Sequence, residues 1–397
     1  MAENRDKKVL NVPALRFPEF SNEWSKDTLQ NVVAFSNGKA HENCVDENGC
    51  YILVNSKFVS TEGSVIKKAT LQLSPLFKSQ FVMVMSDLPN GKALAKCFYI
   101  EEDNIYTLNQ RICSFTAQNG NVSRFLMYQI NRNKYYLRYD DGINQTNLKK
   151  GEVLACPVFI PSIQEQTKIA TFIHLLDKRI ATQTKIIEKY ESLIQAIIYQ
   201  KKTDGIRKGN WQKTVLSEVL QERTEKNING YTVCSVSVSQ GIINQIEYLG
   251  RSFAAKETSH YNVVKYGDIV YTKSPTGDFP YGIVKRSYIK NTVAVSPLYG
   301  VYKPINDNIG VILHFYFMQS NNAFNYLHPL IQKGAKNTIN ITNARFLENS
   351  IPLPITEDEA VDIANALTSV QTKIDIEKSL LRSYEKEKQY LLRQMFI

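Results

Sequence analysis

Several short motifs could place this chain among enzymes that modify or hydrolyse nucleotides, but none of them is complete. Asp278-Phe279-Pro280-Tyr281 is the nearest match to the (Asp/Asn/Ser)-Pro-Pro-aromatic motif of adenine methyltransferases, yet it lacks the first proline and a glycine-rich cofactor loop. Gly91-Lys92 lacks the earlier glycine and the following Ser or Thr of a phosphate-binding loop. The five histidines and six cysteines form no His-x-x-x-His or Cys-x-x-Cys pair. The sequence therefore predicts no catalytic residue and no metal site.

A second set of side chains could read DNA. Arg and Lys pair with guanine, and Asn and Gln with adenine, in the major groove, whereas Lys, Arg and hydroxyl groups contact phosphates. The candidate DNA-binding residues are Lys92, Lys96, Asn109 and Arg111 in the first half of the chain, and Lys273, Tyr281, Lys285, Arg286, Lys333, Lys336 and Asn337 in the second. For each of them a solvated surface position is the alternative interpretation. In a strand, Asn109-Gln110-Arg111 would turn only alternate side chains to one face.

The formal net charge of +10 is distributed unevenly. Segments 162–202 and 356–397 together contribute +1, which leaves +9 on the rest of the chain. A basic excess outside these two segments favours a polyanionic partner there and a protein partner along the segments. Many soluble proteins are basic, so charge alone supports this only modestly.

The two halves of the chain repeat each other. Trp24, Lys26, Leu29 and Val32 recur as Trp211, Lys213, Leu216 and Val219, and Ile143-Asn144-x-Thr146-Asn147 recurs as Ile339-Asn340-x-Thr342-Asn343. Lys96 and Lys285 share one position of this repeat, which is the best reason to prefer them as DNA contacts. An ordered series of matches along both halves indicates a pseudo-symmetric molecule.

Each half ends in a long segment with apolar residues alternately four and three positions apart, the heptad pattern of a coiled coil. The seam residues are Ile169, Ile173, Leu176, Ile180, Ile187, Tyr190 and Ile194 in the first helix, and Ile363, Leu367, Val370, Ile374, Leu381 and Tyr384 in the second. Gln183 and Glu377 are matched polar positions in the middle. Outward-facing Phe172, Leu175 and Ile198 could contact other helices.

Both helices are predicted to begin at a capping box, Ser162-x-x-Glu165 and Thr356-x-x-Glu359, just after a proline. The blocks before the helices are predicted to form short strands. In the first half these lie around Tyr51–Ser56, Phe81–Met85, Lys96–Ile100 and Tyr106–Phe115. In the second half they lie around Tyr231–Val238, Asp268–Lys273, Tyr281–Arg286 and Thr292–Tyr302. The predicted fold class is α+β, with two pseudo-repeated β-rich domains separated by two long antiparallel coiled-coil helices. The expected boundaries are 1–161, 162–202, 203–353 and 354–397.

These features resemble the specificity subunit of type I restriction-modification enzymes. The resemblance rests on the duplicated halves, the lead-in Pro-Ala-Leu-Arg-Phe-Pro-Glu-Phe at 13–20 before Trp24, and the proline-initiated long helices. Stretches such as Met85-Ser-Asp-Leu-Pro-Asn-Gly-Lys and Gly267-Asp-Ile-Val-Tyr-Thr-Lys-Ser-Pro look like the target-recognition domains of that family. The resemblance covers essentially the whole chain.

The resemblance implies that each β-rich domain reads one half of a split double-stranded DNA sequence. It also implies that the helices set the spacing and dock two modification subunits, with restriction subunits joining later. S-adenosylmethionine, ATP and Mg are then expected in the partner subunits, and no cofactor in this chain. We expect a cytoplasmic protein, because the first residues lack a secretory h-region, no apolar run could span a membrane, and the cysteines show no disulfide framework.

Two other functions remain to be distinguished from this one. A non-catalytic, two-headed protein-interaction scaffold would use the same architecture, and salt-sensitive binding to duplex DNA would separate it from a DNA reader. A stand-alone nucleic-acid-modifying enzyme is disfavoured by the incomplete motifs, and a methyl-transfer assay on the purified chain would test it.

Overall fold

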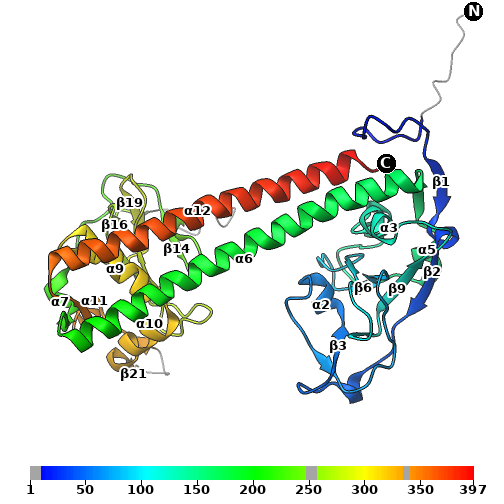
Figure 1. Cartoon of the computed structure of the whole chain (residues 1–397). Helices are drawn as coiled ribbons and strands as arrows, with labels where there is room; N and C mark the ends of the chain where they lie inside the picture. Colours follow the sequence, from blue (N-terminus) through cyan, green and yellow to red (C-terminus); the bar gives the residue numbers. More distant parts are fainter. Residues whose placement is uncertain (1–9, 247–256, 334–338) are drawn as a thin grey trace, which may run out of the picture. The chain divides into compact units, whose positions relative to one another are not determined.

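The structure is a computed structural model that describes residues 10–246, 257–333 and 339–397. The chain forms two compact units (Figure 1). Unit 1 consists of Met1–Thr182 and Leu381–Ile397, and unit 2 is Gln183–Leu380. Each unit therefore combines one β-rich module with parts of both long helices.

The module of unit 1 is built on a four-stranded antiparallel sheet in the order β2-β9-β5-β7. These strands are β2 (Val33–Asn37), β9 (Ile112–Ala117), β5 (Phe81–Val84) and β7 (Cys97–Tyr99). A second sheet has the order β4-β3-β8, formed by β4 (Lys68–Ala69), β3 (Tyr51–Val54) and β8 (Tyr106–Leu108). Helix α3 (Ser123–Ile130) contacts β5, β7 and β9.

Strand β5 contributes side chains to two hydrophobic clusters, one on each face of the sheet. Its four residues are all buried, and successive side chains of a strand point to opposite faces. Phe81 and Met83 accordingly join the cluster that holds Phe125 of α3. Val82 and Val84 join a second cluster around Phe58 of helix α2 (Ser56–Ser60).

The module of unit 2 repeats this arrangement, which confirms the predicted duplication. Its four-stranded antiparallel sheet has the order β13-β20-β17-β18. The strands are β13 (Leu220–Glu222), β20 (Gly300–Pro304), β17 (Ile269–Tyr271) and β18 (Val284–Arg286), and α9 (Asp307–Phe317) packs on β18 as α3 packs on β7. The pairs β14 (Cys234–Ser237) with β15 (Gly241–Asn244), and β16 (Asn262–Val264) with β19 (Val293–Val295), complete the module.

Each module is entered and left through one antiparallel pair of strands. In unit 1, β1 (Ser25–Thr28) pairs with β11 (Pro157–Ile160), and the N–H of Leu29 then donates to the Cys156 carbonyl at 2.9 Å. In unit 2, β12 (Trp211–Val215) pairs with β23 (Ser350–Pro354), and Leu216 donates to the Asn349 carbonyl at 3.0 Å. The two ends of each module are therefore adjacent.

The remaining elements are short. They are α1 (Leu29–Val32), η1 (Glu42–Cys44), β6 (Ser86–Asp87), α4 (Lys134–Leu137), β10 (Thr146–Asn147), α5 (Lys150–Leu154), α7 (Leu216–Val219), α10 (Ser320–Leu327), η2 (His328–Leu330), β21 (Gln332–Lys333), β22 (Ile339–Asn340) and α11 (Asn343–Phe346).

The long helices are α6 (Ile163–Lys208) and α12 (Glu357–Gln394), and both start as predicted. The Ser162 hydroxyl accepts from the Glu165 N–H at 3.3 Å, and the Thr356 hydroxyl accepts from the Glu359 N–H at 3.4 Å. Only this half of each capping box forms. The carboxylate of Glu165 instead pairs with Arg16, and that of Glu359 accepts from the Trp211 indole N–H at 3.0 Å.

Within each unit, α6 and α12 run side by side in opposite directions (Figure 1). In unit 1 the start of α6 meets the end of α12, where Asp177 pairs with Lys388 and Arg179 donates to the Tyr384 hydroxyl. In unit 2, Gln183 donates to the Glu377 carboxylate, so the two matched polar positions meet. The predicted antiparallel coiled coil is confirmed.

The heptad seam positions alternate with exposed residues along both helices. Ile169, Ile173, Ile187, Ile194, Ile363, Leu367 and Ile374 are buried, and Leu176, Ile180, Tyr190, Val370, Leu381 and Tyr384 are half-buried. Ile169 and Ile173 share a core with Leu391 and Met395. Their burial at heptad spacing provides the apolar contact that holds the helices together.

Several predicted elements differ in extent. The first helix continues beyond 202 to Lys208, and the predicted strand Tyr106–Phe115 is two strands separated by a turn in which Arg111 has φ 68°. The predicted strand Thr292–Tyr302 is likewise divided into β19 and β20 around Pro297, which has no backbone N–H for a ladder. Ile198 was expected to face outward, but it is buried.

Within the part of the chain that the structure describes, no helix is long and apolar enough to cross a membrane.

Candidate nucleic-acid interface

Two loops of unit 1 come together on one side of its module. Strand β6 pairs with β10, which brings the loop after Asp87 next to the loop before Thr146. The Asn90 amide donates to the Gly142 carbonyl at 3.2 Å and ties the loops together. Lys92, a predicted DNA contact, is exposed in the first loop. We call residues 88–92 and 140–145 the paired loops of unit 1.

Two carboxylates accept backbone hydrogen bonds in and beside the paired loops. The Asp87 carboxylate accepts from the backbone N–H groups of Ala93 and Leu94 at 2.6 and 3.0 Å. Asp141 accepts from the N–H groups of Ile143 and Asn144 at 2.8 Å each, and bonds from the Asn144 backbone and side chain lower the pKa of Asp141 to about 2. These acids are engaged within the loops, which leaves the exposed side chains at the tips to meet a ligand.

The tips of the paired loops carry two aliphatic side chains that sequence reasoning missed. Leu88 is 68% exposed and Ile143 is 79% exposed. Such side chains can contact the thymine methyl group or insert between base steps. Ile143 belongs to a motif of the sequence repeat, but only polar side chains were predicted to read bases. Asn90 and Asn144, exposed beside them, are amide side chains that could pair with adenine.

The corresponding region of unit 2 contains more of the predicted contacts. The loop after β17 closes with reciprocal backbone hydrogen bonds between Thr276 and Phe279 at 3.0 and 3.1 Å. Strand β21, which contains Lys333, pairs with β22. Lys336 and Asn337 lie outside the described residues.

Lys273 and Tyr281 flank the loop after β17. Lys273 is half-buried, and desolvation lowers the pKa of its ammonium group. The Tyr281 ring lies against the rings of Phe324 and His328, with centroid distances of 5.3 and 5.8 Å. Asp278-Phe279-Pro280-Tyr281 therefore forms part of a turn, with Phe279 buried and Asp278 exposed.

The segment Asn109-Gln110-Arg111 is a turn rather than a strand. Gln110 and Arg111 are both exposed, and the Gln110 amide donates to the Glu42 carboxylate. The alternation rule of a strand therefore does not restrict these three side chains. Asn109 and Arg111 stay predicted DNA contacts.

Lys96 and Lys285, which the sequence repeat matched, do not lie at equivalent places in the two sheets. The strand registers pair Lys96 with Ile283 and Lys285 with Phe98, which corrects the sequence match. The Lys96 ammonium donates to the Ser60 carbonyl at 2.9 Å and lies 3.1 Å from the Glu62 carboxylate. These contacts hold the Lys96 side chain against the end of α2. Lys285 is 4% exposed, and desolvation lowers the pKa of its ammonium group to about 8.

Arg286 is a structural residue, which corrects its assignment as a DNA contact. Its side chain has no exposed surface and pairs with Asp307 at the start of α9. Its guanidinium group lies between the rings of Tyr266 and Tyr288, 4.8 and 4.6 Å from their centroids. Adjacent positions 286 and 287 are both buried, so a phosphate cannot reach Arg286 in this conformation.

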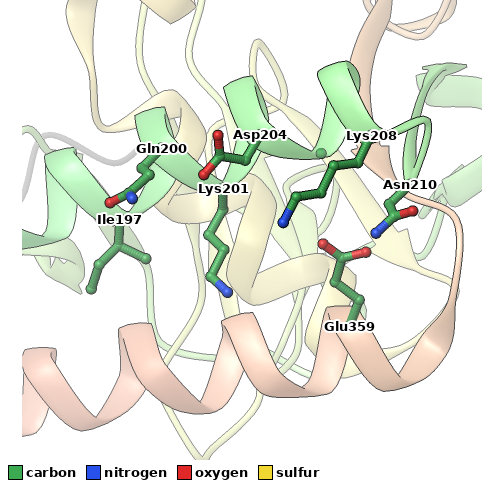
Figure 2. A pocket seen from close by; sticks show the side chains of 8 residues that line it. Ile197, Gln200, Lys201, Asp204, Lys208, Asn210 and Glu359 are labelled. Atoms are coloured by element: carbon green, nitrogen blue, oxygen red, sulfur yellow. The ribbon is translucent and has the colours of Figure 1, made fainter.

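A small cavity of about 220 Å³ lies in unit 2 between the end of α6 and the start of α12 (Figure 2). Its lining includes Lys201, Lys208, Asn210 and Glu359. Asp204, also in the lining, is paired with Arg207. Among the described residues, no group of three or more His, Cys, Asp or Glu side chains could hold a metal ion.

Comparison with known proteins identifies the modules. The sequence model of the type I restriction modification DNA specificity domain matches the chain twice, over residues 21–192 and 215–385. Each match spans one module and a part of one long helix.

A solved structure is similar in fold. The S subunit of a type I restriction-modification system from M. genitalium superposes with a TM-score of 0.59 at 12% sequence identity, covering 97% of this chain and 99% of that one. The HsdS subunit from Thermoanaerobacter tengcongensis and a chain of a type I R-M complex are each 14% identical, and each match covers 94% of this chain and 96% of the other. Their TM-scores are 0.35 and 0.43. Because the two domain matches together span most of its length, the chain belongs to the type I restriction-modification DNA specificity family.

Proposed function

We propose that this chain is the DNA-recognition subunit of a type I restriction-modification complex, with one half of a split target read by each module. The observation that carries the proposal is the duplicated module, matched twice by the DNA specificity domain and built twice on the same strand order. Each module has its own sheet and its own buried clusters. A separate core allows each module to read its own base pairs.

In unit 1, DNA would meet the paired loops and the turn at 109–111. Lys92 and Arg111 are exposed cations there, and Asn90 and Asn109 supply amides. In unit 2 the corresponding contacts would come from the loop containing Lys273 and Tyr281 and from Lys333. Lys336 and Asn337 remain DNA contacts predicted from the sequence.

The chain itself would be non-catalytic, as the family match implies. Methyl transfer and ATP-dependent cleavage would belong to two modification subunits and to restriction subunits, which would bind S-adenosylmethionine, ATP and Mg. The long helices would dock these partners. Leu175 on α6 is 58% exposed, and Ile376 and Tyr390 on α12 are 61% and 57% exposed, which leaves apolar surface for partner helices.

Binding to duplex DNA tests the proposal against the protein scaffold. The chain assembled with its modification subunits should bind duplex DNA with an affinity that falls steeply as salt rises, because each phosphate contact releases bound counterions. Fluorescence anisotropy at several salt concentrations would measure this. Binding that is absent at low salt would favour the scaffold. Binding of S-adenosylmethionine by the isolated chain would contradict the assignment of methyl transfer to partners.

A further inference from the structure

The paired loops of unit 1 expose two aliphatic side chains among polar ones. Leu88 is 68% exposed and Ile143 is 79% exposed, so most of each side chain faces solvent. A single exposed aliphatic residue is common on protein surfaces and needs no explanation. Here each of two loops carries one, and the loops are joined to each other. This arrangement makes the two side chains a candidate contact for a ligand.

The pairing of the loops brings the two side chains to one tip. Strands β6 and β10 are antiparallel, so Leu88, the residue after β6, lies beside the loop that leads into β10. Farther out, the Asn90 amide donates to the Gly142 carbonyl at 3.2 Å, one residue before Ile143. A Cβ atom added to Gly142 would lie 3.3 Å from Oδ1 of Asn90, so the loops touch at this point. We call residues 88–90 and 142–144 the tip of the paired loops.

Hydrogen bonds hold the backbone around Ile143. The Asp141 carboxylate accepts from the N–H groups of Ile143 and Asn144 at 2.8 Å each. The Asp140 carboxylate accepts from the Gly142 N–H at 3.0 Å. A contact surface that is already formed loses less conformational entropy when it binds a ligand. The tip is therefore suited to a contact that depends on shape.

The surroundings of the tip favour DNA over a protein as the ligand. Segments 86–92 and 132–150, which form and flank the loops, contain six Lys or Arg and three Asp, a net charge of +3. Lys92 is exposed in the first loop, and the Arg132 guanidinium donates to the Gly91 carbonyl of that loop at 3.4 Å. The cores of protein interfaces are rich in aromatic residues and poor in Lys, whereas the paired loops contain Lys92 and no aromatic residue.

The side chains at the tip match the edge of an A·T base pair. In the major groove, thymine presents its C5 methyl group, and adenine presents the N7 acceptor and the N6 amino donor. Aliphatic side chains contact the methyl group, and an Asn amide can bond both adenine groups. Asn90 uses one amide N–H on Gly142, and its other N–H and its oxygen have no partner among the described residues. The tip therefore offers a contact to each base of the pair.

We propose that Leu88 and Ile143 read the methyl group of a thymine in the major groove, so that the half-site of unit 1 contains an A·T pair at that position. The inference rests on the proposed function and names a base that one module recognises. It differs from insertion between base steps, which kinks the duplex and does not depend on a methyl group.

Deoxyuridine provides the test, because uracil pairs with adenine as thymine does and lacks only the C5 methyl group. Each thymine of the methylated motif is replaced in turn, and Kd is measured by fluorescence anisotropy for the full chain assembled with its modification subunits. We expect one replacement, in the half-site of unit 1, to weaken binding about fourfold, the effect of one buried methyl group. The double variant Leu88→Ser with Ile143→Ser should bind the thymine and deoxyuridine duplexes equally, because serine presents no methyl group to the base.

A matched variant in unit 2 controls for the loss of an exposed leucine. Leu298 is 71% exposed, and Leu298→Ser should keep the fourfold preference for thymine at the position read by unit 1. Because all three side chains are exposed, the double variant and the control should both keep the wild-type unfolding temperature. This measurement separates a lost base contact from a lost fold.

Equal affinity of the wild-type complex for the thymine duplex and every deoxyuridine duplex would overturn the inference while the proposed function would stand. A double variant that binds more weakly but keeps the wild-type preference for thymine would also overturn it, because the methyl group would then be read elsewhere. Weaker assembly of the double variant with normal DNA affinity would assign the tip to a protein partner instead. A wild-type complex that binds none of these duplexes would contradict the proposed function itself.

Discussion

At the scale of single residues, the two glutamates at the starts of α6 and α12 occupy the same position of the repeat but make different contacts. Glu165 is 1% exposed and receives two hydrogen bonds of 2.7 Å from the Arg16 guanidinium. Its repeat partner Glu359 is half-buried and lines the cavity shown in Figure 2. A buried carboxylate paired by a forked guanidinium depends strongly on its partner, whereas one that faces a cavity does not.

Removing Arg16 should therefore destabilise unit 1 strongly. We expect Arg16→Ala to lower its free energy of unfolding by about 3–5 kcal/mol, because the Glu165 charge would remain buried without a partner. Urea denaturation followed by tryptophan fluorescence would measure this, since Trp24 lies in unit 1 and Trp211 in unit 2. The matched change Glu359→Gln should cost about 1 kcal/mol or less, because the amide oxygen can still accept from Trp211. Similar losses in the two variants would disagree with the burial described above.

The sequence could predict that the two halves repeat each other, but not every pair of corresponding residues or what each residue touches. Lys96 and Lys285 were matched in the sequence, but the strand registers pair Lys96 with Ile283 and Lys285 with Phe98. Only the fold shows Glu62 beside Lys96. Arg286 looked like a surface cation because its partner, Asp307, lies in another element. The exposure of Leu88 and Ile143 could not be predicted, since the sequence alone does not distinguish an exposed aliphatic residue from a buried one. Partners distant in sequence decided each of these outcomes.

At the scale of elements, helix α6 contains a glycine that its neighbour requires. A Cβ atom added to Gly205 would lie 1.9 Å from Cδ1 of the Trp211 ring. In an isolated helix Gly→Ala stabilises by about 1 kcal/mol, but here the ring would have to move away from its contact with Glu359.

Gly205→Ala should accordingly destabilise unit 2 by about 1–3 kcal/mol, the usual range for overpacking. A red shift of tryptophan emission and an earlier urea transition would show it. Gly151→Ala is the control, because a Cβ at Gly151 of α5 meets nothing within 4 Å. That variant should be neutral or gain up to about 1 kcal/mol. A stabilised Gly205→Ala variant would mean that the helix end does not pack on Trp211.

The two faces of α12 should respond differently to charge. Ile374 is 1% exposed, and Ile376 two residues later is 61% exposed. Asp at Ile374 would bury an unpaired carboxylate, so we expect a loss of several kcal/mol and a lower thermal unfolding temperature. Ile376→Asp should leave the unfolding temperature unchanged and weaken assembly with modification subunits, measured by size-exclusion chromatography. Equal unfolding temperatures for the two variants would contradict the assignment of Ile374 to the buried seam of the coiled coil.

The bounds of an element could be predicted where the pattern of apolar residues extended over many residues. They were predicted wrongly where the pattern was short. The heptad pattern over α6 and α12 located both helix starts, because proline, cap and seam agree there. The run Tyr106–Phe115 concealed the turn at Arg111, since apolar residues on both sides of the turn imitate one strand. Helix α6 passes its expected end because Gly205 keeps a helical backbone, and the helix ends instead at Lys208, before Gly209 with φ 75°.

At the scale of the whole molecule, the central claim is that the two modules read DNA independently. Each is closed by its own strand pair, and in each the chain enters and leaves at adjacent residues, Leu29 beside Cys156 and Leu216 beside Asn349. A module closed in this way can be exchanged without disturbing the helices or the strands that hold it. The segment 216–349 is therefore the natural unit of replacement in the second half.

The most direct test replaces residues 216–349 with the matching segment of a relative and reads the methylated motif from the genome of a host that supplies the modification subunits. The strands β12 and β23 stay intact in this exchange, so the new module should fold in place. We predict a bipartite motif in which one half is new, while the other half and the spacing are retained. A motif altered in both halves would contradict independent reading, and it would mean that the two modules read DNA as one composite surface.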